Sequence, residues 1–141
     1  MIFSSSKTRQ IGAVLVEFAI TIPILITLVM GTIEIGWALY IQNTLVDAAR
    51  YGTRIAVTDA TQDTSTIQSK VKSYIQDSGI DIDTNTTTVT VEPSPVSAVL
   101  RGTPVTVSID VPYDTHVSLL PAILFLGTTH LKAHTTMAKE Y

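Results

Sequence analysis

The sequence predicts an α+β fold with one long N-terminal transmembrane-plus-amphipathic helix, one short helix and a small antiparallel sheet of about three strands. Three observations support this fold class. A long apolar run lies near the N-terminus, apolar residues at helical spacing continue it, and runs of alternating apolar and polar residues follow later in the chain. The 141 residues are enough for one small domain in addition to the long helix.

The composition excludes several classes of function. There are 9 Lys and Arg against 12 Asp and Glu, so the formal net charge is −3, and no basic cluster marks a nucleic-acid interface. The chain has no cysteine, which excludes disulfides, thiolate metal sites and a cysteine nucleophile. Charged residues make up 15% of the chain, where about 25% is usual, so intrinsic disorder is not expected.

The first element is the apolar run from Ile11 to Ile41, in which Glu17 and Glu34 are the only charged residues. As a helix this run would be roughly 46 Å long, whereas the bilayer core is about 30 Å thick. The part that follows Ala13 is long enough by itself to span a membrane. The alternative is the buried core helix of a soluble protein, but the remaining residues are too few to cover a helix that is apolar on all sides.

The residues before this run indicate how the helix is oriented. Residues 1–10 contain Lys7 and Arg9 and no acid, which by the positive-inside rule places this end in the cytoplasm. The run is too long for a cleaved secretory signal, and no small-residue cleavage site follows it, so we expect a retained signal anchor. The expected organisation is a basic leader at 1–12, a transmembrane signal anchor at 13–40, an amphipathic continuation at 41–57 and an external α+β head at 58–141.

Glu17 is the unusual residue of the expected span, because a carboxylate costs on the order of 2.5–3.5 kcal/mol at the centre of a membrane. In one interpretation it lies in the headgroup region near a helix N-terminus, where the helix dipole favours a negative charge. In the other, the chain is cut after Gly12, and the new amine of Ala13 lies at i,i+4 spacing from Glu17. The same amine on a staggered neighbour would set the axial register of packed helices.

Other residues of the long helix point to bending and to partner contacts. Pro23 removes one helical hydrogen bond and is expected to kink the helix. Glu34, Arg50 and Arg54 are either contacts to a partner subunit or part of an ordinary solvated face. Asp47 is expected to pair with Arg50 at i,i+3 spacing.

Aromatic and apolar spacing predicts where the span ends and how the helix continues. Trp37 and Tyr40 stand where an aromatic belt at the outer membrane surface is expected. Beyond them, apolar residues recur at helical spacing and extend the helix to about Val57. They are Ile41, Leu45, Ala48, Gly52 and Ile55.

The head is expected to contain a helix at about 66–78, ended by Gly79, and three half-buried strands around 88–92, 105–111 and 130–137. The apolar segment from Leu119 to Gly127 is too short to span a membrane as a helix. It is a core segment, a partner surface or an element that dips into the outer leaflet.

The sequence contains no constellation that indicates catalysis or metal binding. His130 and His134 are four residues apart, but they lie on an alternating segment without a third ligand. His116 is isolated, and the three aspartates at 77, 81 and 83 lack the spacing of a calcium loop. Phosphate-binding and hydrolase motifs are missing too. We therefore expect no enzyme, cofactor, metal ion or small-molecule substrate.

Three patches of the N-terminal half follow one another in a recognisable order. They are Val16-Glu17-Phe18-Ala19-Ile20 with Pro23, then Gly31-Thr32-Ile33-Glu34-Ile35-Gly36, then Ala48-Ala49-Arg50-Tyr51-Gly52-Thr53-Arg54. Together they resemble the TadE-like proteins of Tad/Flp pilus assembly over about residues 12–57, and the tail Ala138-Lys139-Glu140 is a weaker match. Gly12 with Glu17 also resembles the type IV prepilin processing site, where a prepilin peptidase cuts after the Gly. Ala13 departs from the major type IV pilins, many of which begin with an aromatic residue or Met.

The resemblance implies a minor pilin or pseudopilin that acts in the assembly of a Tad/Flp pilus at a bacterial inner membrane, with its head in the periplasm or outside the cell. The implied partners are a prepilin peptidase, other pilin or pseudopilin subunits, the inner-membrane pilus platform and membrane lipid. The alternative is an unprocessed single-pass envelope protein that displays a small binding domain.

Overall fold

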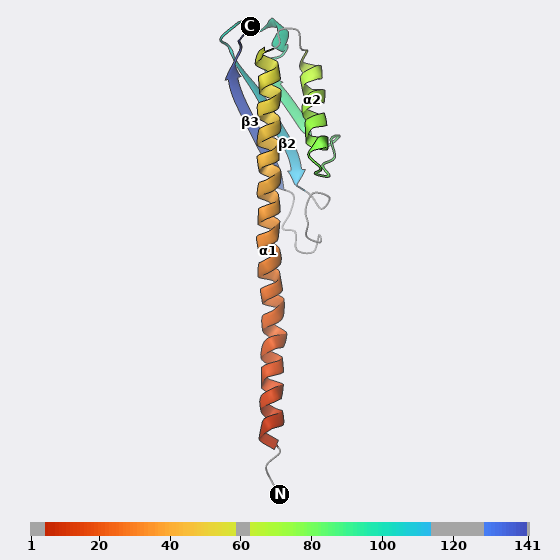
Figure 1. Cartoon of the computed structure of the whole chain (residues 1–141), viewed down its shortest axis with the longest axis vertical. Helices are drawn as coiled ribbons and strands as arrows, with labels where there is room; N and C mark the ends of the chain where they lie inside the picture. The colour runs from red at the N-terminus through yellow and green to blue at the C-terminus, as the bar shows by residue number, and fades with distance from the viewer. Residues whose placement is uncertain (1–4, 59–62, 114–128, 141) are drawn as a thin grey trace. The chain divides into compact units, whose positions relative to one another are not determined.

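The computed structural model describes residues 5–58, 63–113 and 129–140, and side chains from Gly12 onward (Figure 1). Its elements are α1 (Ser5–Thr58), α2 (Thr64–Asp77), β1 (Thr88–Glu92), a 3-10 turn (Val96–Ala98), β2 (Pro104–Tyr113) and β3 (Thr129–Ala138). The long helix, the short helix and the three-stranded antiparallel sheet confirm the expected α+β class. His116 and the segment 119–127 lie outside the described residues.

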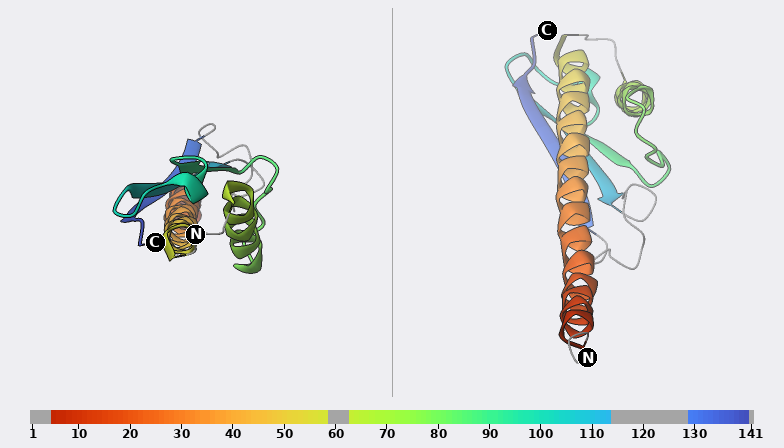
Figure 2. Two further views of the ribbon diagram at one scale, coloured as in Figure 1. Left: turned by 90° about the horizontal axis from the view of Figure 1, so that it is seen from above. Right: turned by 60° about the horizontal axis from the view of Figure 1, so that its bottom comes forward.

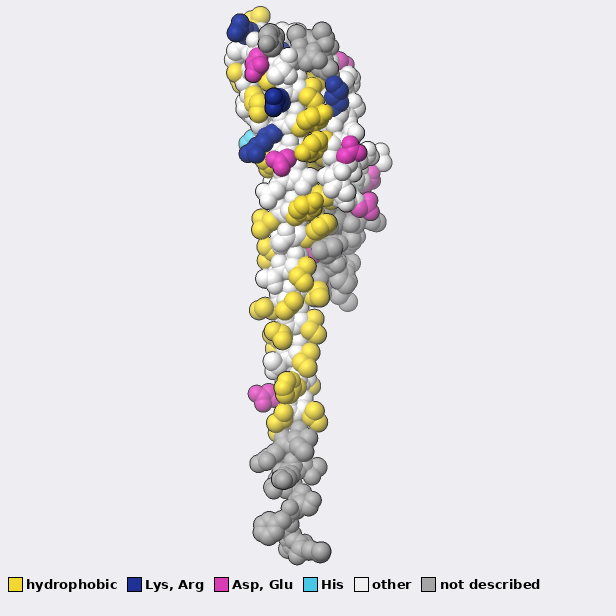
Figure 3. All heavy atoms as spheres, viewed as in Figure 1, with side chains coloured by type: hydrophobic (Ala, Val, Ile, Leu, Met, Phe, Trp, Pro, Cys, Tyr) yellow, Lys and Arg dark blue, Asp and Glu magenta, His cyan; other side chains and the backbone are white. Residues whose placement is uncertain are grey.

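The chain divides into two compact units, residues 1–36 and residues 37–141. The first unit contains the N-terminal part of α1. From residue 12 to residue 36 its side chains are exposed nearly throughout, and hydrophobic ones cover the visible side of this part of the helix (Figure 3). The most apolar window of the helix has a mean hydropathy of 2.4, and none of that window is buried. Within the described residues, α1 is the helix that is long and apolar enough to cross a membrane, and it fits a single-pass anchor.

Threonine hydroxyls in this apolar segment bond to the helix itself. The Oγ1 of Thr21 donates to the Glu17 carbonyl oxygen, that of Thr27 to the Pro23 carbonyl oxygen, and that of Thr32 to the Leu28 carbonyl oxygen, each over 2.8 Å. No water is available inside a bilayer, so these bonds keep the hydroxyls satisfied in lipid. The helix continues through Pro23, and the expected kink stays a prediction.

The second unit is built on the sheet β1-β2-β3. All pairs are antiparallel, with Val91 opposite Val107 and Val107 opposite Thr135. Burial alternates along β1 and β2, as expected for strands with one face in a core and the other in solvent. β2 extends to Tyr113, beyond the expected end, because β3 pairs with it along its whole length.

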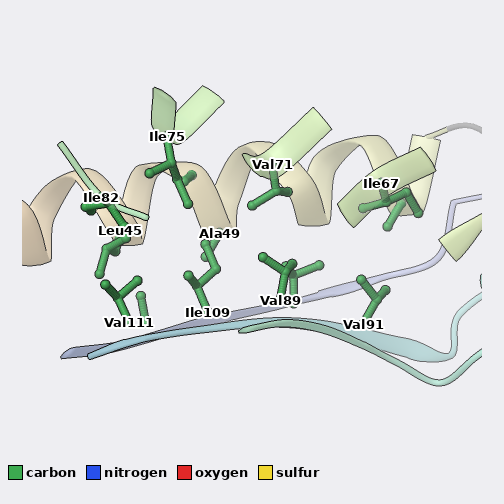
Figure 4. Packing of buried hydrophobic residues seen from close by; sticks show 14 of the residues in the cluster. Leu45, Ala49, Ile67, Val71, Ile75, Ile82, Val89, Val91, Ile109 and Val111 are labelled. Carbon is green, nitrogen blue, oxygen red and sulfur yellow. The ribbon is translucent and has the colours of Figure 1, made fainter. Parts of the chain in front are cut away.

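Both helices cover the same face of this sheet (Figures 2 and 4). The apolar stripe of α1 enters the core with Leu45 and Ala49, and α2 points its own apolar stripe toward the same face of the sheet (Figure 4). The stripe of α2 consists of Ile67, Val71 and Ile75, which are fully buried. α2 ends as expected, since Gly79 adopts a φ of +76° that only glycine takes without strain.

The C-terminal residues close the end of α1. Lys139 is 3% exposed, and its Nζ donates to the Ala56 carbonyl oxygen over 2.7 Å. The backbone N–H of Glu140 donates to the Val57 carbonyl oxygen over 3.2 Å. These carbonyls belong to the last turn of α1, which has no intrahelical donors, and the ammonium also suits the negative end of the helix dipole. The tail that weakly matches the family pattern is therefore a cap for α1.

Gly52 is the point of closest approach between α1 and the rest of the core. A Cβ added there would lie 2.5 Å from Val71 Cγ2 of α2 and 3.4 Å from Val107 Cγ1 of β2. Both neighbours are buried, β-branched side chains with little freedom to move. The glycine therefore sets the distance at which α1 packs against α2.

We expect Gly52→Ala to destabilise the second unit by about 1–3 kcal/mol, because the new methyl group overpacks the α1–α2 contact. The control is Gly36→Ala, whose Cβ would meet nothing within 4 Å and which should be neutral or slightly stabilising. The measurement is thermal unfolding of the full chain in mild detergent. The single tryptophan, Trp37, packs against the core and supplies the fluorescence signal. Equal unfolding temperatures for the two variants would contradict the close-approach role.

Candidate functional site

The candidate processing site lies on the exposed N-terminal part of α1. Gly12, Ala13 and Glu17 are all exposed, and a Cβ built on Gly12 would meet nothing within 4 Å. Four residues advance an α-helix by about 6 Å and slightly more than one turn, so positions 13 and 17 share one face. Within the described residues, the Glu17 carboxylate has no ion-pair partner.

This arrangement suits cleavage followed by charge pairing. Gly12 weakens a helix interior by about 1 kcal/mol relative to Ala, which favours local unwinding around a bond that a peptidase must hold in extended form. A cut after Gly12 would place a positive amine at the new start of α1, one turn before Glu17. Glu17 would then also lie near the positive end of the helix dipole.

The other proposed contact residues lie in different places. Glu34 is half-exposed on the part of α1 that belongs to the first unit. Arg50 and Arg54 lie on the exposed side of α1 in the second unit. The expected pair of Asp47 and Arg50 is present at 3.5 Å, with side chains 58% and 64% exposed, so it contributes only about 0–1 kcal/mol.

The third patch of the resemblance therefore combines two different roles. Its small residues, Ala48, Ala49 and Gly52, are buried against the sheet and α2. Its two arginines, Arg50 and Arg54, lie two residues before and two residues after Gly52 and remain in solvent. Core packing explains the small residues, whereas no core contact among the described residues of the second unit involves the arginines.

A groove between α1 and α2 was not foreseen from the sequence. Its lining residues come from one exposed stripe of α1 and from the C-terminal end of α2: Tyr40, Thr44, Asp47, Tyr74, Asp77 and Ser78. It encloses about 370 Å³. Next to it the rings of Tyr51 and Tyr74 stack with centroids 5.0 Å apart. Only the spacing of the α1 residues gave a signal in the sequence, because docking of α2 beside them depends on the tertiary fold.

The solvent face of the sheet carries a charged cluster. Asp110 accepts from His130 Nδ1 at 2.6 Å and from Lys132 Nζ at 3.0 Å. These hydrogen bonds, that of His130 first, hold the pKa of Asp110 below its ordinary value of 3.8, because they favour the ionised carboxylate. His134 is exposed on the same face, and among the described residues no group of three or more His, Cys, Asp or Glu side chains is placed to hold a metal ion.

We expect this cluster to stabilise the head above pH 3.8 and to lose its contribution as the pH falls through the lower folded-state pKa of Asp110. In Asp110→Asn the acid-dependent part of the stability should be smaller than in the parent chain. Unfolding followed by Trp37 fluorescence as a function of pH measures this difference. Asp81→Asn is the control, since Asp81 is an exposed loop aspartate. Parallel pH profiles for Asp110→Asn and the parent chain would contradict the assignment.

Comparison with known proteins agrees with the N-terminal pattern. Residues 12–54 match the family model described as TadE-like protein, so the resemblance is confirmed over that segment. The match covers less than half of the chain and contains Gly12, Glu17 and both arginines. It implies a minor pilin role related to the Tad pilus. No curated protein and no solved structure matches the chain.

Proposed function

We propose that this chain, whose helix α1 carries the TadE-like pattern, is a minor pilin or pseudopilin that takes part in assembling a Tad/Flp pilus and is processed after Gly12. The observation that carries the proposal is Glu17, an exposed carboxylate in an apolar helix, at the fifth position after an accessible glycine within the matched segment. The role is structural rather than catalytic.

The proposed location is the bacterial inner membrane. The 24 residues from 13 to 36 form about 36 Å of apolar helix, enough for a bilayer core of about 30 Å. Lys7 and Arg9 favour a cytoplasmic N-terminus. At the other end, the rings of Trp37 and Tyr40 stack with centroids 5.4 Å apart. Trp and Tyr are enriched at membrane surfaces, so this pair favours the outer surface at that point of the helix.

Processing would change how α1 behaves in the membrane. Before the cut, Glu17 has no counter-ion on the described part of the helix and is tolerated near the bilayer surface. After the cut, the amine of Ala13 neutralises Glu17 of the same chain or of a neighbour. The threonine hydroxyls of this segment donate hydrogen bonds to carbonyl oxygens of their own helix. Glu17 is therefore the group that would select one axial offset between packed α1 helices.

The proposed partners follow from these steps. A prepilin peptidase would act at the cytoplasmic face, and other pilin subunits and the pilus platform would contact α1 within the membrane. The alternative role, an unprocessed anchor for a binding domain, is favoured by one observation, the self-contained second unit with its own core and a polar sheet face. In that role Gly12 would be replaceable.

The first expected outcome concerns processing. Intact-mass measurement of the full chain from native membranes should show a mature form that begins at Ala13, whereas Gly12→Val, with a branched side chain next to the scissile bond, should keep its leader. Gly36→Val is the matched control, because its Cβ also meets nothing within 4 Å and it lies away from the cut. Functional pili whose chains all retain residues 1–12 would rule out processing.

The second expected outcome concerns the charge of Glu17. Glu17→Gln keeps the size of the side chain but removes its charge, so membrane insertion should persist while the number of pili falls about tenfold or more, the effect of losing about 1.4 kcal/mol per contact. Glu17→Asp retains the charge and should restore part of the assembly. Pili are counted by electron microscopy, with membrane levels measured in parallel. Normal numbers of pili in Glu17→Gln would contradict the proposal that Glu17 sets the axial register between subunits.

A further inference from the structure

We infer that the groove between α1 and α2, lined by Tyr40, Thr44, Asp47, Tyr74, Asp77 and Ser78, receives the Arg54 side chain of a second copy of this chain. This inference rests on the proposed function, because it describes how neighbouring subunits would contact one another outside the membrane. The groove lies wholly within the second unit.

The lining of the groove has the chemistry of a cation site. Tyr40 and Tyr74 are 49% and 37% exposed, so parts of both rings remain accessible to a ligand. Asp47 and Asp77 add two exposed carboxylates, and within the described residues Asp77 has no ion-pair partner. A planar guanidinium stacks on aromatic faces and bonds carboxylates in the same site, which favours arginine over lysine.

The chain itself supplies the complementary group. Arg54 is exposed on α1, has no ion-pair partner among the described residues and has no packing role in the core. Arg50 is bound to Asp47 only by a long, solvent-exposed pair, which leaves that carboxylate able to accept a second donor. On the face shown in Figure 3, basic and acidic side chains lie beside a line of hydrophobic ones along the helices of this unit.

The spacing along α1 makes the contact intermolecular. Asp47 and Arg54 lie seven residues apart on one side of the helix, about 10 Å along its axis, too far for a direct contact within one chain. A parallel copy displaced by about two helical turns would bring its Arg54 level with Asp47 of the first copy. Because Asp47 and Arg54 share one side of α1, the two copies would face each other with that side.

Site-directed cross-linking tests the contact directly, because the chain has no cysteine of its own. Copies with Thr58→Cys and copies with Ser73→Cys, carrying different tags, are expressed together as full chains in native membranes. Both positions are exposed and lie one helical turn from Arg54 and Asp77, so the two charged groups are kept. An arginine–aspartate contact separates the Cα atoms by more than a disulfide allows, so a short flexible bismaleimide is used. The mixed pair should cross-link at least about fivefold more than a control pair of Thr58→Cys with Thr88→Cys, an exposed position on the sheet.

Charge reversal provides an independent measurement. In this measurement the association of tagged full chains is followed by co-purification from membranes. Arg54→Glu alone and Asp77→Lys alone should each reduce it about fivefold, and the double variant should regain it because the reversed charges attract again. The matched control is Arg101→Glu with Asp81→Lys, which changes the charges equally at other exposed positions.

The outcomes separate this inference from the proposed function. Specific cross-linking with recovery in the double variant supports the contact, even if intact mass shows an uncleaved leader and the pilin role fails. Normal processing and pili, together with cross-linking no greater than that of the control pair, would overturn the contact and leave the function standing. Cross-linking of Ser73→Cys to a different protein, without the mixed pair, would also overturn it.

Discussion

The proposed function depends on one constraint, a single carboxylate in the apolar N-terminal part of α1. Between residues 13 and 33, Glu17 is the only charged side chain, and the threonines of that segment satisfy their own hydroxyls. Apolar helix surfaces pack with similar energies at many axial offsets, whereas a charge is stabilised only where its counter-ion lies. An amine created at Ala13 would therefore turn a lipid-compatible anchor into a subunit with a defined register.

The second unit meets a different requirement, because it must hold the far end of α1 firmly while leaving one side of that helix open. Gly52 lets α1 approach α2 closely, and the Lys139 ammonium caps the last turn from the opposite end of the chain. The sheet contributes further, since Gln42 Nε2 donates to the Lys132 carbonyl oxygen of β3 over 2.7 Å. These contacts all lie on the core side of α1, so stability of the unit does not depend on its exposed arginines.

Much of this fold could be predicted from periodicity, and the remainder depends on tertiary pairing. The alternation of valines around Val107 identified β2, and the i,i+3 spacing identified the Asp47–Arg50 pair. The partner of His130 could not be found in the same way, because Asp110 meets it only through the register of β2 and β3. The groove likewise required α2 to dock beside α1, and no local pattern reports where a second helix docks.

Two stripes of α1 in the second unit have the same residue spacing and are offset from each other by one position in the sequence. The buried stripe contains Ile41, Leu45, Ala48, Gly52 and the half-buried Ile55. The neighbouring stripe contains the exposed residues Tyr40, Asp47, Tyr51 and Arg54 and the half-buried Thr44. A helix face that only meets water is usually rich in lysine and glutamate, whereas tyrosine and arginine are enriched where proteins meet. One residue of offset corresponds to about 100° around the helix, so α1 can serve the core and a second partner at once. This separation lets the exposed stripe vary with its partner without cost to the core, and the small residues of the buried stripe then follow from packing alone.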